Sequence, residues 1–128
     1  MTARTPLVAV VDDEEDVRHA LQRLLRAAGF EVLAYASGVE FLRHAQQSAP
    51  DCVVLDLHMP VQSGFEVQVE LTRRRLGIPV VAITGNDTVD GRRRAMANGG
   101  DAYLCKPMDD EALIGAITAA IARRDATR

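Results

Sequence analysis

The chain has 128 residues, with 15 basic and 18 acidic side chains, a formal charge of −3 and 48% hydrophobic residues. This length suits one domain with a real core, and the slight acidity gives no electrostatic footprint for nucleic acid. No run approaches the roughly 20 apolar residues that span a bilayer, and the start lacks the apolar segment of a secretory signal. We therefore expect a cytoplasmic domain that contacts neither nucleic acid nor membrane.

Apolar runs that are too short for helices alternate with helical patterns along the chain. The first run, 7–11, predicts a buried strand. The helix expected after it, over about 14–28, has apolar residues at three- and four-residue spacing and ends near Gly29. The next run, 32–35, predicts a second strand, and the Ser-Gly-Val-Glu sequence at 37–40 fits a capping box that opens the second helix.

Two further units follow in the same order. The run at 52–55 predicts the third strand, and a second capping box, at 63–66, opens the helix after it. The run at 80–83 predicts the fourth strand, and the helix after it is expected to begin near Asp87 and to end at Asn98. The residues that this fourth helix is expected to turn inward are Val89, Ala95, Met96 and Ala97.

The fifth unit is a strand at 102–105 and a helix from about Asp109, whose acidic start suits the positive end of the helix dipole. Five such units predict parallel strands joined by right-handed crossovers, with helices on both faces of the sheet. The fold class is therefore α/β, a doubly wound (βα)5 sandwich, for which we adopt the flavodoxin-like strand order 2-1-3-4-5. We expect the domain to cover 1–121 and the polar residues 122–128 to be a tail or a truncated linker.

Charged residues directly follow three of the expected strands. Asp12 and Asp13 follow the first strand, Asp56 follows the third and Lys106 follows the fifth. In an open α/β sheet ligands bind at the carboxyl edge, and the adopted strand order makes the three carboxylates converge there. Gathered carboxylates repel one another, and a divalent cation relieves that repulsion. Ligands that are all oxygen favour a hard ion, and a few carboxylates completed by water and phosphate suit Mg²⁺.

The same edge has the groups that an aspartyl-phosphate requires. Thr84, at the end of the fourth strand, adds a hydroxyl donor beside Lys106. The metal ion and the lysine would neutralise the phosphoryl oxygens while a carboxylate attacks in line, and we expect Asp56 to be this nucleophile. A structural alternative is that acidic residues after a strand only cap the next helix, which applies to Asp13 or Asp16.

Taken together, these residues resemble the receiver domain of response regulators, over a span from Leu7 to about Ile121. The motifs that carry the resemblance are Asp12-Asp13, Asp56-Leu57-His58-Met59-Pro60, Thr84-Gly85 and Lys106-Pro107. The resemblance implies that Asp56 accepts a phosphoryl group from a histidine kinase, a phosphotransfer protein or a small phosphodonor. It also implies that the domain catalyses only its own phosphotransfer and dephosphorylation and is otherwise no enzyme.

The resemblance further implies how Mg²⁺ is held. Asp13 and Asp56 would ligate the ion directly, and Asp12 would act through a metal-bound water. His58 would contribute its backbone carbonyl, because the position two after the phosphoacceptor supplies a main-chain oxygen in such domains. Its imidazole is a poor ligand for a hard ion. His58 is a less usual residue at its position, and Met108 stands where many relatives have an aromatic residue.

Thr84 and Tyr103 resemble the switch pair of the family. Phosphate would draw the Thr84 hydroxyl inward and the Tyr103 ring would follow, which changes the surface formed by the fourth helix, the fifth strand and the last helix. That surface would control a partner or an output domain, and the overall spacing resembles receivers that precede helix-turn-helix domains. A homodimer through it is one expected arrangement. The alternative for Tyr103 is a half-buried core aromatic whose hydroxyl reaches the surface.

Two other functions stay open at this point. One is a Mg²⁺-dependent phosphohydrolase with an aspartyl intermediate, which is weakened because 56–58 lacks a second carboxylate two residues after Asp56. The other is a receiver-like binding module that works without phosphorylation. The arginine clusters at 73–75 and 92–94 are expected to lie on solvated helix faces rather than to contact nucleic acid.

Overall fold

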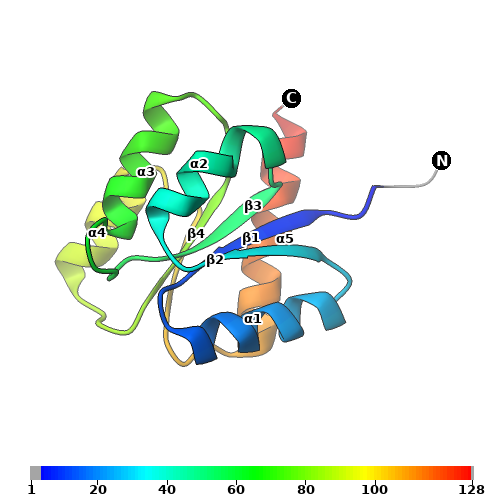
Figure 1. The fold of residues 1–128 in the computed structure, drawn as a ribbon, viewed down its shortest axis with the longest axis horizontal. Helices are drawn as coiled ribbons and strands as arrows, with labels where there is room; N and C mark the ends of the chain where they lie inside the picture. The colour runs from blue at the N-terminus through cyan, green and yellow to red at the C-terminus, as the bar shows by residue number, and fades with distance from the viewer. Residues whose placement is uncertain (1–3, 128) are drawn as a thin grey trace.

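Strands and helices alternate from end to end in the computed structural model, which describes residues 4–127 (Figure 1). The strands are β1 (Leu7–Val11), β2 (Glu31–Tyr35), β3 (Cys52–Asp56), β4 (Val80–Thr84) and β5 (Ala102–Cys105). The helices are α1 (Glu15–Ala27), α2 (Gly38–Ser48), α3 (Gly64–Arg73), α4 (Val89–Ala97) and α5 (Asp110–Ala126). All strand pairs are parallel and the order is β2-β1-β3-β4-β5, which confirms the flavodoxin-like prediction.

Helices cover both faces of the sheet, with α1 and α5 on one face and α2, α3 and α4 on the other (Figure 1). The central strands are therefore buried on both sides, which is why their sequences are continuous apolar runs. Under α1 and α5 the buried residues from the two helices are Leu21, Leu25, Leu113, Ile117 and Ala120. Under α2 and α3 they are Phe41, Leu42, Ala45, Val67 and Leu71. Each large side chain of this kind stabilises the fold by roughly 1.5–3 kcal/mol when it is fully buried.

The starts of α2 and α3 follow the two predicted caps, with one difference in detail. Ser63 and Glu66 form the complete capping box of α3, in which each side chain accepts from the other residue's backbone N–H. Ser37 accepts from the backbone N–H of Glu40, but the return bond of a box is not formed there. Helix α5 starts where expected, and the Asp109 side chain caps it. Helix α1 begins without a side-chain cap, so neither of the aspartates considered for that role fulfils it.

Helix α4 has a different inward face from the predicted one. Thr88 caps it, and Ala95 is its one buried residue within the described range. Val89 is 88% exposed and Met96 is 44% exposed, so the prediction that they face the core was wrong, as it was for Ala97. Gly91, Arg92 and Ala95 share the face that meets the sheet, because Ala95 is buried and the other two lie near Tyr103 of β5.

Helix α5 continues to Ala126, beyond the last residue of its apolar stripe. Residues 122–126 are therefore helical, while the division of the chain at 121 stays a prediction. Arg124, in this last stretch, donates to the Asp51 carboxylate at 2.7 Å. No helix in the described part of the chain is long and apolar enough to cross a membrane.

Asp51 lies directly before β3, at the amino edge of the sheet, and is 2% exposed. Arg4 donates to its two carboxylate oxygens at 2.9 and 2.6 Å, and the backbone N–H of Leu7 donates at 2.8 Å. Burial alone would raise the pKa of Asp51, but the hydrogen bonds from Arg4, Leu7 and Arg124 hold it well below the usual value. This carboxylate thus joins the start of the described chain to the end of α5.

Candidate functional site

Three carboxylates meet at the carboxyl edge of the sheet. Asp12 follows β1 and Asp56 ends β3, and these strands are neighbours that pair Val11 with Leu55. One carboxylate oxygen from each of Asp12, Asp13 and Asp56 lies within 4.8 Å of the others. Asp12 and Asp56 are buried, whereas Asp13 is exposed. The structure therefore brings the three predicted aspartates together, with the cluster open to solvent on the Asp13 side.

The Asp56 carboxylate is in an unfavourable place for a negative charge. Burial raises the pKa of Asp56 to about 6, and the charges of Asp12 and Asp13 act in the same direction. The backbone N–H of His58, which donates to Asp56 Oδ1 at 3.1 Å, and the Lys106 ammonium oppose this rise. An added cation at this edge would therefore favour the ionised form of Asp56.

Lys106 provides the fixed positive charge of the site. Its Nζ lies 3.0 Å from Asp12 Oδ2, 3.0 Å from Glu14 Oε1 and 3.5 Å from Asp56 Oδ2. Burial lowers the pKa of Lys106, but the bonds to Asp12 and Glu14 outweigh burial and raise it above the usual value. Glu14 was not among the predicted site residues, although an acid directly after an aspartate pair is a signal that could have suggested it.

Thr84 and Tyr103 are both buried, but the structure does not join them by a contact. The Thr84 hydroxyl accepts from the backbone N–H of Asn86 at 3.0 Å and donates to the Asn86 carbonyl at 3.2 Å. Tyr103 is 7% exposed, and its hydroxyl has no hydrogen-bond partner within the described residues. The alternative in which this hydroxyl reaches the surface was therefore wrong. Burial also raises the pKa of Tyr103.

Gly64 is a site residue that sequence reasoning missed, because it was considered only as part of a helix cap. A Cβ at position 64 would lie 2.3 Å from the Asp56 carbonyl oxygen and 2.8 Å from Leu57 Cα. The backbone N–H of Gly64 donates to the Leu57 carbonyl at 3.0 Å. No other residue type fits so close to the backbone of Asp56, so Gly64 fixes the loop that follows this residue.

His58 and Met108, the two residues that are unusual for the family, lie on opposite sides of the site. The His58 ring is exposed and meets the Phe65 ring edge-on, with 6.1 Å between the centroids. Met108 packs against the core under α1 and α5. It also lines a hollow of about 580 Å³ between α1 and the start of α5, together with Glu14 and Lys106.

A doubly wound parallel sheet with buried aspartates and a lysine at its carboxyl edge is the architecture of CheY-like receiver domains. The chain belongs to the response regulator receiver domain family, whose sequence model matches residues 8–118. It is a signalling domain of the two-component kind rather than a classical enzyme, and this membership disfavours the phosphohydrolase interpretation.

Similar proteins agree with this membership. Transcriptional regulatory protein PrrA of Mycobacterium leprae is 40% identical over 96% of this chain and 53% of its own length. Nodulation protein W of Bradyrhizobium diazoefficiens is 38% identical over 91% of this chain and 52% of its own length. The chain spans about half the length of the curated relatives it matches.

A solved structure, the crystal structure of FixJ-N, superposes with a TM-score of 0.87 at 35% identity, covering 93% of this chain and 95% of its own. The Vibrio cholerae chemotaxis protein CheY4 superposes with a TM-score of 0.86 at 28% identity, covering 91% of this chain and 99% of its own. The matched regions of these two proteins are thus nearly complete chains, which supports a receiver fold over almost the whole sequence.

Proposed function

We propose that this domain accepts a phosphoryl group on Asp56 and uses it to switch the surface of α4, β5 and α5. The donor is a histidine kinase, a phosphotransfer protein or a small phosphodonor. A P–O bond to an Asp56 carboxylate oxygen forms while the P–N bond of the donor's phosphohistidine breaks, and the electron pair stays on the leaving imidazole. The observation that carries the proposal is the position of the Asp56 carboxylate among Asp12, Asp13 and Lys106.

The residues of the acidic cluster fit a magnesium ion. The donor set is all oxygen, and the buried Asp12 Oδ2 has the Lys106 ammonium 3.0 Å away as its ionic partner. Asp13 and Asp56 would hold Mg²⁺ directly, Asp12 through a water, and His58 through its backbone carbonyl. When bound, the ion supplies charge that neutralises the phosphoryl oxygens.

The protein's own residues provide the rest of the reaction. Lys106, already held 3.5 Å from Asp56 Oδ2, is placed to bind a phosphoryl oxygen on the side of β5. The Thr84 hydroxyl would exchange the Asn86 carbonyl for a phosphoryl oxygen. Thr84 and Tyr103 then act as the switch pair, and the new charge biases two arrangements that the fold already permits.

The names of the relatives support a role in controlling an output. PrrA is a transcriptional regulatory protein in which the matched region covers about half the length. We propose that the present domain, over 1–121, likewise controls an output domain through a linker at 122–128 or a separate partner. It contacts no nucleic acid itself, dimerises through α4, β5 and α5 when phosphorylated, and works in the cytoplasm.

The direct test is to incubate the chain with Mg²⁺ and acetyl phosphate and to measure its intact mass. We expect an adduct of about 80 Da, the mass added by one phosphoryl group. The adduct should be absent from Asp56→Asn and present in Asp16→Asn, which alters an exposed carboxylate in the first turn of α1.

Two other results of this experiment would favour the two alternative functions. No adduct with acetyl phosphate, with a panel of histidine kinases or with a beryllofluoride analogue, in protein shown to be folded, would replace the proposal with a binding module independent of phosphorylation. Steady release of phosphate from many small phosphate esters, at a rate that Asp56→Asn abolishes, would instead favour a phosphohydrolase.

A further inference from the structure

Arginine side chains, rather than apolar ones, connect the exposed part of α4 to the molecule. The guanidinium carbon of Arg92 lies 4.6 Å from the centroid of the Tyr103 ring, and that of Arg94 lies 4.2 Å from the centroid of the Phe65 ring. These distances are those of cation–π contacts. All three arginines at 92–94 are exposed, as expected, and Arg93 pairs with Asp90, but the guanidinium groups of Arg92 and Arg94 also lie over aromatic rings.

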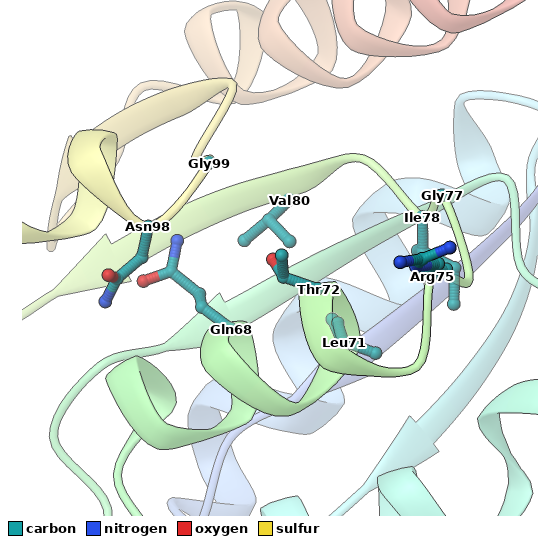
Figure 2. Close-up of a pocket in the computed structure, with 9 residues that line it drawn as sticks. All are labelled: Gln68, Leu71, Thr72, Arg75, Gly77, Ile78, Val80, Asn98 and Gly99. Carbon is teal, nitrogen blue, oxygen red and sulfur yellow. The ribbon is translucent and has the colours of Figure 1, made fainter.

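The C-terminal end of α4 is fixed by polar bonds. Gly100 and Gly99 donate their backbone N–H groups to the carbonyls of Ala95 and Met96, and Gly99 has a φ of +92°, which together form a Schellman motif. The buried Gln68 side chain of α3 also donates to the Ala95 carbonyl, at 2.9 Å. Figure 2 shows Gln68 at one end of a hollow of about 400 Å³ between α3 and this end of α4. The two helices are therefore bonded here but not closely packed.

Tyr103 occupies its buried position without the help of the other half of the switch pair. The Thr84 hydroxyl is engaged by the backbone of Asn86, and the Tyr103 hydroxyl has no hydrogen-bond partner among the described residues. The Arg92 guanidinium lies over the Tyr103 ring, while the Asp87 side chain and the Thr88 backbone lie near the Tyr103 hydroxyl. A Cβ on Gly91 would make only an ordinary contact with the Tyr103 hydroxyl, at 3.6 Å, but would lie 2.8 Å from Thr88 Oγ1, so it is the Thr88 cap that leaves little room there.

We propose that Arg92 is a positioning residue, whose guanidinium holds the Tyr103 ring in its buried position before any phosphoryl group arrives. The part of this inference that concerns the switch rests on the proposed function. A cation–π contact at an exposed site changes a two-state equilibrium by about two- to fivefold. Loss of Arg92 therefore increases the fraction of molecules in which the ring has left its buried position by this factor.

Nuclear magnetic resonance of ring-labelled tyrosine tests the position of the ring directly. The chain has two tyrosines and no tryptophan, so Tyr35, which packs on Phe41 at the other end of the sheet, is an internal reference. We expect Arg92→Met to move the Tyr103 ring signals toward those of a solvent-exposed tyrosine and to leave the Tyr35 signals in place. Arg92→Lys, which retains a cation, should restore most of the wild-type position.

The matched control is Arg93→Met, which changes the next residue of the same helix and breaks an exposed ion pair. It should leave both sets of ring signals unchanged. Equal Tyr103 signals in wild type, Arg92→Met and Arg93→Met, in folded protein, would overturn the inference. If Arg92→Met does not fold, Arg92→Gln and Arg92→Lys provide the comparison of uncharged and charged side chains.

A second measurement connects the ring to the switch. Because the ring is already buried in the wild type, we expect the rate of phosphorylation by acetyl phosphate to fall in Arg92→Met, by at most about fivefold, and to be unchanged in Arg93→Met. A change in the ring signals without a change in rate would restrict Arg92 to a structural role and reject its part in the switch. The ring signals need no phosphorylation, so they test Arg92 even if the proposed function fails.

Discussion

Strand β3 has a buried aspartate at each end, and the two carboxylates are in opposite electrostatic states. Asp51 and Asp56 are each 2% exposed. Asp51 accepts hydrogen bonds from two arginines and a backbone N–H, which hold its pKa well below the usual value. Asp56 has two further aspartates beside it and one lysine, and its pKa is raised to about 6. The exposed fractions are equal, so the difference comes from what opposes burial: hydrogen bonds from Arg4, Leu7 and Arg124 outweigh it at Asp51, whereas at Asp56 burial prevails and the neighbouring aspartates add to it.

The comparison separates a carboxylate that stabilises the fold from one that is available for chemistry. At the amino edge the positive partners are complete, and no further ligand is required. At the carboxyl edge the negative charges exceed the positive ones, so the fold is less stable until a cation or a protonated state compensates. Asp51 and Asp56 should therefore have opposite effects on the free energy of unfolding, and substitution of each one measures its effect.

The largest expected effect is the loss of Asp51. Asp51→Ala leaves the mostly buried guanidinium of Arg124 without its main partner and should lower the free energy of unfolding by about 3–5 kcal/mol. Urea denaturation at pH 7 measures the change. Arg93→Ala, which breaks an exposed ion pair, should lose less than about 1 kcal/mol. A loss below about 1 kcal/mol for Asp51→Ala would mean that the two ends of β3 do not differ as described.

The opposite sign is expected for Asp56. Its pKa of about 6 in the fold lies above the usual value, so ionisation costs stability above pH 6, and the cost vanishes below about pH 4, where the carboxyl is protonated in both states. Without divalent cations, Asp56→Asn should raise the free energy of unfolding by about 1–2 kcal/mol at pH 8, after allowance for screening by water. Urea denaturation at pH 8 and pH 4 tests this, and an equal gain at both values would reject the electrostatic cause.

Bound Mg²⁺ should offset part of the stability that the wild type loses through ionised Asp56. A ligand present at ten times its dissociation constant stabilises a fold by about 1.4 kcal/mol. We expect Mg²⁺ to raise the melting temperature of the wild type and of Arg93→Ala, and to have no effect on Asp13→Asn or Asp56→Asn. Thermal unfolding with Mg²⁺ and with a chelator measures it. A similar gain in Asp56→Asn would place the ion outside the acidic cluster.

The smallest effect concerns the two thiols, one near each edge. Cys52 follows Asp51 and is fully buried, and burial raises its pKa to about 12, whereas Cys105 precedes Lys106 and is partly exposed. Cys105 should react with a disulfide reagent at least about tenfold faster than Cys52, because it is more accessible and its thiolate is less strongly suppressed. Single-cysteine variants with serine at the other position measure the two rates. Equal rates would indicate that the amino edge opens as readily as the carboxyl edge.

Most of the fold could be predicted because buried strands and helix starts have recognisable local patterns in the sequence. Continuous apolar runs identified the strands, the capping box at Ser63 identified the start of α3, and the acidic residues from Asp109 on identified the start of α5. The carboxyl-edge residues could be predicted for the same reason, since each follows a strand directly. Their proximity required only the strand order, although their roles in binding phosphate and metal stay predictions.

The parts that could not be predicted depend on distant partners or on the phase of a helix. Asp51 meets Arg4 and Arg124 across 47 and 73 residues, and no local pattern indicates such pairs. The prediction of the inward face of α4 was wrong because this face has no apolar stripe. Small residues and arginines meet the aromatic rings there instead. Gly64 was missed because a glycine required by close approach looks the same in a sequence as one that starts a helix.

The shared carboxylate of Asp51 also has a practical consequence. Because Arg4 and Arg124 both bind it, the described chain begins and ends on the side of the molecule away from the acidic cluster (Figure 1). A fluorescent tag or a surface tether joined at either end would leave the carboxyl edge accessible to solution. The domain is therefore suited to immobilisation on a sensor chip, and a short peptide that bridges the two ends is a natural starting point for circular permutation.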